Sequence, residues 1–198
     1  MFYQHFGPKT ATVACGLGLA ASLLGTATPA IAAEFTGPSG TTEVKVEATA
    51  ENMKFRVPTV ISFAADAAGE LTGPSADATK IENLSVFGIH VTGMKVAQES
   101  PWNIVADKEA AAAASTDNNI AFSVGPDGAV RNAADAMGDS GVDLSGEHAY
   151  NMSYQGDQGD AVKLLSSGSV AKVSGGALQD EGSKVATITW TLAPGNAQ

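Results

Sequence analysis

The chain has 198 residues, with 21 acidic against 11 basic side chains and a formal net charge of −10 at pH 7. This acidic balance excludes the basic face that nucleic-acid phosphates and anionic lipid surfaces require. The single cysteine excludes an intramolecular disulfide framework, so a packed core must supply the stability. Neutral or cationic polymers remain compatible partners, although the simpler role of an acidic surface is solubility.

Residues 1–33 are predicted to be a secretory signal peptide. The chain begins with a short polar stretch holding one basic residue and no acid, and residues 11–24 are apolar. That apolar run is long enough for a signal core and too short to span a bilayer. Ala30 and Ala32 then supply the small-x-small pattern of a cleavage site, so cleavage is expected after Ala32 or Ala33.

The mature chain, residues 34–198, is expected to be secreted and to form one domain. Cys15 lies inside the apolar run and not at its end, which disfavours a lipoprotein cleavage site. No second apolar run is long enough to span a membrane, and no charged or Pro-rich linker divides the mature chain.

Strand signals dominate this domain. Short alternating or β-branched runs are separated by clusters of Gly, Pro, Asp, Asn and Ser, whereas the only strong helix signal is residues 107–114, Asp-Lys-Glu followed by five alanines. The expected strands are residues 42–48, 54–57, 59–64, 81–86, 89–96, 102–106, 120–124, 129–132, 149–154, 162–165, 170–173 and 185–192.

These elements predict an all-β fold, an antiparallel β-sandwich or barrel-like sandwich of ten to twelve short strands with at most one short helix. Gly-Pro-Asp-Gly at residues 125–128 is typical of a hairpin turn, because Pro126 pre-sets φ and Gly128 accepts a positive φ. Residues 133–146, rich in Ala, Gly, Asp and Ser, are expected to form a long surface loop.

The last expected strand has the clearest pattern, with period-two alternation through Ile-Thr-Trp-Thr-Leu. Its apolar side chains are expected to point to one face and its threonines to the other. The apolar set is Ala186, Ile188, Trp190 and Leu192, and the polar set is Thr187, Thr189 and Thr191.

Three segments, taken in order along the chain, resemble the WxL domains of Gram-positive surface proteins. Val57-Pro58-Thr59-Val60-Ile61-Ser62-Phe63 is similar to an early strand of that family, and Trp102-Asn103-Ile104 is similar to its first Trp-x-Leu motif, with Ile in place of Leu. Trp190-Thr191-Leu192 is similar to the second, C-terminal motif. The resemblance implies a β-rich adhesive module that attaches non-covalently to peptidoglycan, often within a surface complex, through its Trp motifs.

The resemblance therefore makes Trp102, Ile104, Trp190 and Leu192 the candidate wall-binding or glycan-binding residues. Core packing remains the simpler role for Trp190, because it shares a strand face with other apolar residues. Trp102 follows a proline and has a more exposed pattern, so it is the better candidate for stacking on a sugar. Tyr150 and Tyr154, four residues apart on one expected strand face, either extend that surface or pack together under a loop.

No metal site or cofactor is predicted. His90 and His148 are far apart in sequence and have no third nitrogen or sulfur ligand. A solvated acidic loop is the simpler interpretation of four acids that recur every fourth residue without calcium-loop spacing, and weak calcium binding stays open. Those acids are Asp135, Asp139, Asp143 and Glu147.

One pattern points toward an enzyme. Gly138-Asp139-Ser140-Gly141 matches the nucleophile segment of chymotrypsin-like proteases, and His90, Asp107 and Ser140 follow that family's chain order. Val142 stands where a second glycine is expected, and the His-to-Ser span is too short for two barrels. A tetrapeptide of Gly, Asp and Ser also arises easily by chance in this composition, so we expect no enzymatic activity.

The sequence therefore predicts a secreted, non-enzymatic cell-surface protein that associates non-covalently with peptidoglycan or another cell-wall polymer, with or without other surface proteins. The alternative is a pilin-like or matrix-fibre structural subunit, because a small cysteine-free sandwich with open edge strands invites strand addition. The polymer, the oligomeric state and an intramolecular Lys–Asn crosslink stay open.

Overall fold

The computed structural model describes residues 46–178 and 182–198. The expected signal peptide, its cleavage position, Cys15 and the first part of the expected strand 42–48 lie outside the described residues. Residues 46–48 are described; they are exposed and belong to no sheet, so the strand expected there is absent from this part. In the described part of the chain, no helix is long and apolar enough to cross a membrane.

Thirteen strands form three sheets within the described residues, and each pair is antiparallel except β6–β7. In the β5 sheet, β5 (Ile89–Gln98) pairs with β13 (Ala186–Pro194) on one edge and with β9 (Val142–Asp143) and β10 (Asn151–Met152) on the other. The β7 sheet has the order β2 (Ala64–Ala65), β3 (Glu70–Thr72), β12 (Leu165–Ala171), β7 (Asn119–Gly125), β6 (Asn103–Ile104), and β8 (Arg131–Asn132) also pairs with β7. The β4 sheet has the order β1 (Phe55–Arg56), β4 (Lys80–Asn83), β11 (Ala161–Lys163).

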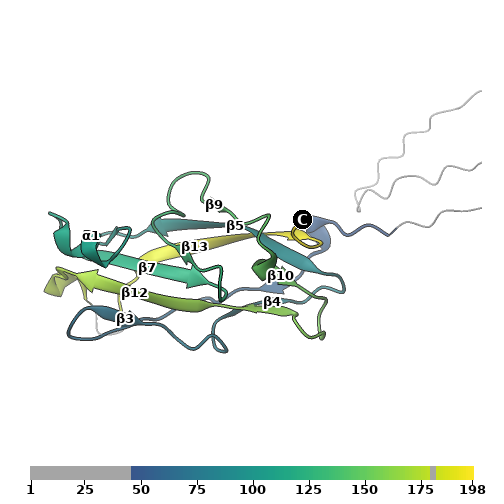
Figure 1. The fold of residues 1–198 in the computed structure, drawn as a ribbon, viewed down its shortest axis with the longest axis horizontal. Helices are drawn as coiled ribbons and strands as arrows, with labels where there is room; N and C mark the ends of the chain where they lie inside the picture. Colours follow the sequence, from purple (N-terminus) through teal and green to yellow (C-terminus); the bar gives the residue numbers. More distant parts are fainter. Residues whose placement is uncertain (1–45, 179–181) are drawn as a thin grey trace, which may run out of the picture. The chain divides into compact units, whose positions relative to one another are not determined.

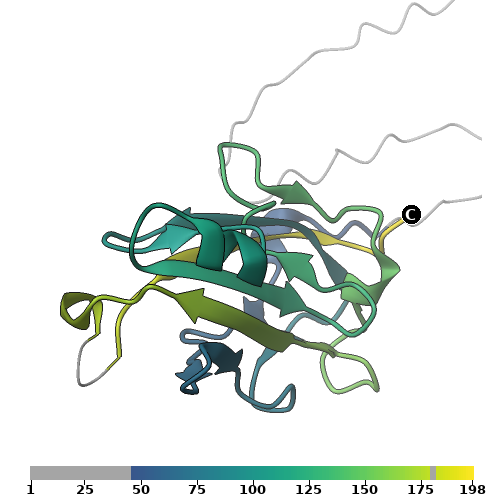
Figure 2. The ribbon, with the colours of Figure 1, turned by 60° about the vertical axis from the view of Figure 1, so that its left-hand side comes forward.

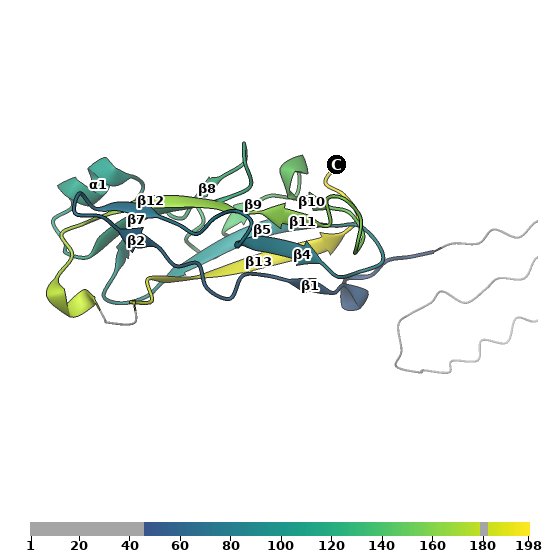
Figure 3. The same cartoon turned by 90° about the horizontal axis from the view of Figure 1, so that it is seen from below.

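The sheets form two layers with the core between them. Only the buried Leu164 separates β11 from β12, so the β4 sheet continues the β7 sheet along the same layer (Figure 1). The β5 sheet forms the other layer, as the view from below shows (Figure 3). Ile120, Phe122 and Val124 of β7 join Ile89 and Met94 of β5 in one hydrophobic cluster. The predicted all-β sandwich is confirmed.

The alternation expected for the last strand is confirmed in β13. Its apolar side chains are buried or half-buried, whereas Thr187, Thr189 and Thr191 are exposed. The ladder with β5 runs from Ala186 opposite Gln98 to Pro194 opposite Ile89, with a bulge after Thr191. The bulge inserts one residue of β5, which keeps apolar side chains of both strands on the core side.

The predicted helix is also present, as α1 (Lys108–Ala113). Asp107 caps it, because its side-chain oxygen accepts a hydrogen bond from the Ala110 N–H at 2.7 Å. Ala111 is fully buried where α1 packs on β7 and β12, on the side of the β7 sheet that faces away from the β5 sheet (Figures 2 and 3). Three short 3-10 helices complete the described elements: η1 (Ala50–Asn52), η2 (His148–Tyr150) and η3 (Gly175–Ala177).

The predicted hairpin turn joins β7 to β8. Gly128 has a φ of +76° and the Ala129 N–H donates to Pro126 O at 3.0 Å. Gly125, with a φ of +155°, has the Tyr150 hydroxyl and backbone atoms within 2.9 Å of where a Cβ would lie. The turn therefore needs glycine at both positions, one for backbone conformation and one also for space.

The strand predicted at residues 59–64 is wrong except for Ala64. Residues 57–63 form no ladder, although Val57, Ile61 and Phe63 pack against the core. The pairing of the flanking strands explains why these residues form no ladder. β1 pairs with β4 and β2 pairs with β3, but β3 ends at Thr72 and β4 begins only at Lys80. The turn between β3 and β4 leaves no backbone opposite these residues for hydrogen bonding.

The prediction that residues 133–146 form a long surface loop is only partly correct. Part of the stretch packs inward. Ala133, Ala136 and Leu144 are buried, and β9 pairs with Gly93 and Met94 of β5. The Val96 N–H also donates to Ala136 O at 2.8 Å. Small side chains here let the segment lie close against β5 and cover one edge of the β5 sheet.

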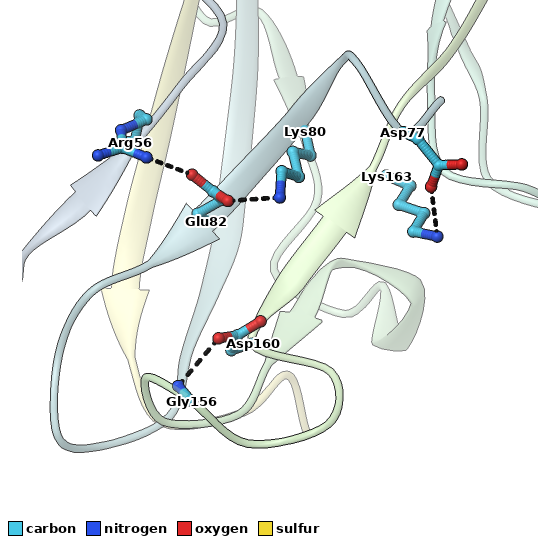
Figure 4. A network of polar contacts seen from close by, with 7 residues as sticks. All are labelled: Arg56, Asp77, Lys80, Glu82, Gly156, Asp160 and Lys163. Atoms are coloured by element: carbon cyan, nitrogen blue, oxygen red, sulfur yellow. Dashed lines mark hydrogen bonds and ion pairs between the residues drawn. The ribbon is translucent and has the colours of Figure 1, made fainter. Parts of the chain in front are cut away.

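The outer face of the β4 sheet carries a group of ion pairs (Figure 4). Glu82 of β4 contacts Arg56 of β1 at 2.8 Å and Lys80 at 2.6 Å, while Lys163 of β11 contacts Asp77 at 2.6 Å. Lys80 and Arg56, in that order, lower the pKa of the Glu82 carboxyl. Since β4 alternates, these charges lie opposite the buried Ile81 and Asn83 and mark the solvent side.

We expect Glu82→Gln to lower the free energy of unfolding at pH 7 by at most about 1 kcal/mol, because the pairs are exposed and screened. A carboxyl whose pKa is lowered on folding stabilises the protein above its unfolded pKa and loses that effect as the pH falls. Urea unfolding at pH 7 and pH 3 should therefore show the difference only at pH 7. Glu51→Gln on the exposed η1 is the control, and an equal loss in both variants would contradict the assignment.

Candidate functional site

The first Trp motif is part of the core. Trp102 is only 4% exposed, and its backbone N–H donates to Glu99 O at 2.9 Å in the turn between β5 and β6. Ile104 in β6 is buried and lies opposite Ile120 of β7. The expected exposure of Trp102 is therefore wrong: Pro101 does not begin a surface strand but lies inside the turn from Glu99 to Trp102, after which the indole enters the hydrophobic cluster.

The second motif lies in the β5 sheet. Trp190 is half-buried against the cluster and lies opposite Met94, while Leu192 is buried and lies opposite Val91. Core packing, the simpler role predicted for Trp190, agrees with this placement. The two motifs thus belong to different sheets of one sandwich, and all four of their predicted site residues contribute to the same core. Trp102 and Ile104, being buried, present no side-chain surface to a polymer in this conformation.

The two tyrosines do not form the predicted surface. Tyr150 lies in η2 and is fully buried, with its hydroxyl donating to Ala129 O at 3.1 Å. Burial raises the pKa of Tyr150 to about 12, so the phenol stays protonated as a donor. Tyr154 is exposed in the turn after β10. The two tyrosines do not share a strand face, because Tyr150 belongs to η2 and Tyr154 lies beyond β10. One side chain is buried in the core and the other is exposed.

The candidate metal ligands are engaged separately. His90 Nδ1 lies 2.9 Å from Gly195 O, and His148 is exposed on η2. Glu147 forms an ion pair with Arg131, whereas Asp143 accepts a hydrogen bond from the Ser145 N–H, which lowers the pKa of its carboxyl. Over residues 46–178 and 182–198, no three His, Cys, Asp or Glu residues come together as a metal site.

The protease-like residues have other hydrogen-bond partners. The His90 ring contacts the C-terminal segment, Asp107 caps α1, and Ser140 is exposed in the loop before β9. None of the hydrogen bonds among the described residues joins any two of these three side chains, so Ser140 and His90 do not form the nucleophile–base pair that the sequence pattern suggested.

The surface that the sequence motifs do produce is the outer face of β13, which we call the threonine row (Thr187, Thr189 and Thr191). These three exposed hydroxyl side chains lie on the opposite face of the strand from Trp190. Opposite them on β5 are the exposed Lys95 and Ala97, as well as Gly93. The three threonines are uncharged, although Lys95 lies opposite Thr189 and the Thr187 hydroxyl donates to the Glu99 carboxylate at 3.3 Å. Threonine hydroxyl groups both donate and accept hydrogen bonds, and the methyl groups can contact apolar C–H surface.

Two surface hollows flank the sheets. One, of about 380 Å³, is lined by residues of the β5 sheet and the C-terminal segment, including His90, Ser145 and Asn196. The other, of about 330 Å³, lies on the outer face of β7 and β12 beside α1. The second hollow is lined by Glu70, Asp107 and Lys108 beside the serines of β7 and β12. Each of these charged groups has a partner there, because Lys108 pairs with Glu70 and Asp107 caps α1.

The four predicted site residues thus lie in the hydrophobic core or pack against it, whereas the three threonines of β13 are exposed. The alternation of threonines is visible in the sequence, whereas the WxL resemblance rests on the tryptophan side of the same strand. Comparisons with protein-family models, curated proteins and solved structures find no match to this chain.

Proposed function

We propose that this chain is a secreted, non-enzymatic β-sandwich that associates non-covalently with peptidoglycan or a related cell-wall polymer, and that the threonine row is its contact surface. The observation that carries this proposal is the two-sided character of β13. Trp190 and Leu192 fix the strand to the core, and three hydroxyl groups are thereby held in a line on the outside. A rigid strand positions such groups more accurately than a loop does.

The chemistry of the row suits a polysaccharide more than a charged polymer. Glycan strands present hydroxyl groups and C–H faces, which threonine meets with one group of each kind. An extended polymer also needs a flat strip along which several repeats can bind, rather than an enclosed pocket. The overall acidity of the chain disfavours anionic wall polymers, which leaves the neutral glycan as the supported partner.

A sedimentation assay with purified cell-wall sacculi tests this function. We expect the wild-type protein to pellet with sacculi and Thr189→Glu to bind about fivefold more weakly, since a lost hydrogen bond of about 1 kcal/mol changes affinity by that factor. Ser167→Glu is the matched control, because Ser167 is exposed on β12 of the other layer. Wild-type protein that stays in the supernatant while a known wall-binding control pellets rejects the proposal.

A second function, that of a structural subunit of a pilus or matrix fibre, is favoured by a different observation. The nine-residue strand β13 lies at a sheet edge and pairs only with β5 among the described residues. A long open edge accepts an added strand from another chain. Sedimentation velocity and electron microscopy of concentrated protein test this function, and monomers alone at high concentration reject it.

A further inference from the structure

The edges of the sheets differ greatly in length. Apart from β13, the edge strands among the described residues are only two or three residues long: β1, β2, β6, β8, β9, β10 and β11. Very short edge strands are a common protection against pairing with other chains. β13 has nine residues, contains no charged side chain and reaches Pro194 only at its end. It therefore lacks the short length, the charged side chains and the internal proline that protect other edge strands.

The backbone of β13 is hydrogen-bonded on one side. Its ladder with β5 is extended by the Glu99 N–H to Val185 O at 2.9 Å and by the Gly195 N–H to Gly88 O at 2.8 Å. On the opposite side, no backbone group of the described residues bonds to β13. Alternate N–H and C=O groups along this edge therefore point away from the sheet, ready to pair with an added strand.

The two faces of β13 define what an added strand must carry. On the core side, Ile188 and Trp190 are only half-buried, so neighbouring apolar side chains would cover them further. On the outer side the threonine row favours polar neighbours. The matching sequence is an alternation of apolar and polar residues over about seven positions.

That alternation is present in residues 42–48, where Val44, Val46 and Ala48 alternate with acidic and basic residues. Val46 is 94% exposed, an unusual position for a β-branched apolar side chain. Residues 46–48 are exposed throughout and lead into η1, which contacts β13 (Figure 3). The Val46 side chain is thus exposed although only three residues separate it from η1, which contacts β13.

We propose that residues 42–48 of one copy add as a strand to the β13 edge of a second copy. Val44, Val46 and Ala48 then lie beside Ile188 and Trp190, and the charged residues lie beside the threonine row. Because donor and acceptor differ, each copy can give and receive a strand, and the contact repeats into an open chain. Such pairing presupposes the structural-subunit function and names its partner.

Cysteine crosslinking tests the contact directly. The full chain carrying Cys15→Ser provides two variants, Lys45→Cys as donor and Thr189→Cys as acceptor, and the two are mixed under mild oxidation. Opposite residues of antiparallel strands are about 4.5–5.5 Å apart at Cα, which fits a disulfide. Thr187→Cys and Thr191→Cys cover the neighbouring registers. We expect a disulfide-linked dimer in about tenfold greater yield than with Ser167→Cys on β12 as acceptor.

A proline variant supplies the independent check. Val46→Pro removes the backbone N–H and should abolish the crosslink, whereas Val46→Thr should retain it. The fold tolerates both because Val46 is 94% exposed. Equal dimer yields with Thr189→Cys and with the Ser167→Cys control overturn the pairing. A single chain that carries both Lys45→Cys and Thr189→Cys also overturns it if the disulfide forms within the monomer. Fibres that form without the crosslink reject this pairing alone, and crosslinked closed dimers without fibres reject only the fibre function.

Discussion

Trp102→Ala is expected to lower the free energy of unfolding by about 3–5 kcal/mol, the usual cost of removing a large buried aromatic side chain. Trp102 is 4% exposed and belongs to the cluster that joins the two layers. Its removal leaves a cavity beside the turn between β5 and β6, where Glu99 N–H and Val185 O continue the ladder with β13. Urea unfolding monitored by circular dichroism measures the change.

Trp102→Phe separates packing from polar effects. The indole Nε1 is buried without a hydrogen-bond partner, so phenylalanine removes an unsatisfied donor while keeping most of the ring. We expect this variant to lose less than half of what Trp102→Ala loses. A Trp102→Ala protein that is as stable as wild type but no longer pellets with sacculi would instead assign Trp102 to the wall contact and contradict its burial.

The parts of the fold that sequence reasoning predicted correctly are those with local signals. β13 alternates over most of its length, β7 is a mostly apolar run interrupted by Ser123, and α1 combines an Asp cap with alanines, so each pattern alone indicates the element. The 125–128 turn follows from the backbone preferences of Pro and Gly. These signals need no knowledge of neighbours in space.

The errors arise where a distant neighbour decides. Residues 57–63 alternate like a strand, but the turn that follows β3 leaves them without a ladder. Residues 133–146 have loop composition, yet β5 binds part of them along its edge. The exposure of Trp102 depends on the turn at Pro101, which composition does not reveal. The open edge of β13 likewise follows from strand order, which only the tertiary structure provides.

Asn83 offers the other large expected effect, because it is a buried amide at the end of β4 with its hydrogen bonds satisfied. Its Nδ2 donates to Phe87 O and to Ser153 O, each at 2.7 Å, and its Oδ1 accepts from the Ser85 N–H at 2.7 Å. The side chain thereby joins the loop after β4 to the segment after β10. Asn83→Leu keeps the volume and leaves two carbonyls and one N–H without partners. We expect a loss of about 3–5 kcal/mol in unfolding free energy.

Asn83→Asp distinguishes this hydrogen-bonding role from packing. An ionised carboxylate at this position accepts from Ser85 but faces two carbonyl oxygens without a proton to give, so its folded-state pKa must rise. A group with a raised folded pKa destabilises the protein as the pH rises above its unfolded pKa of about 3.9. We therefore expect the stability of this variant to improve relative to wild type between pH 7 and pH 4, because the protonated acid again donates one bond. Asn52→Asp on the exposed η1 should show no such recovery, and a pH-independent loss at Asn83 would contradict the donor role.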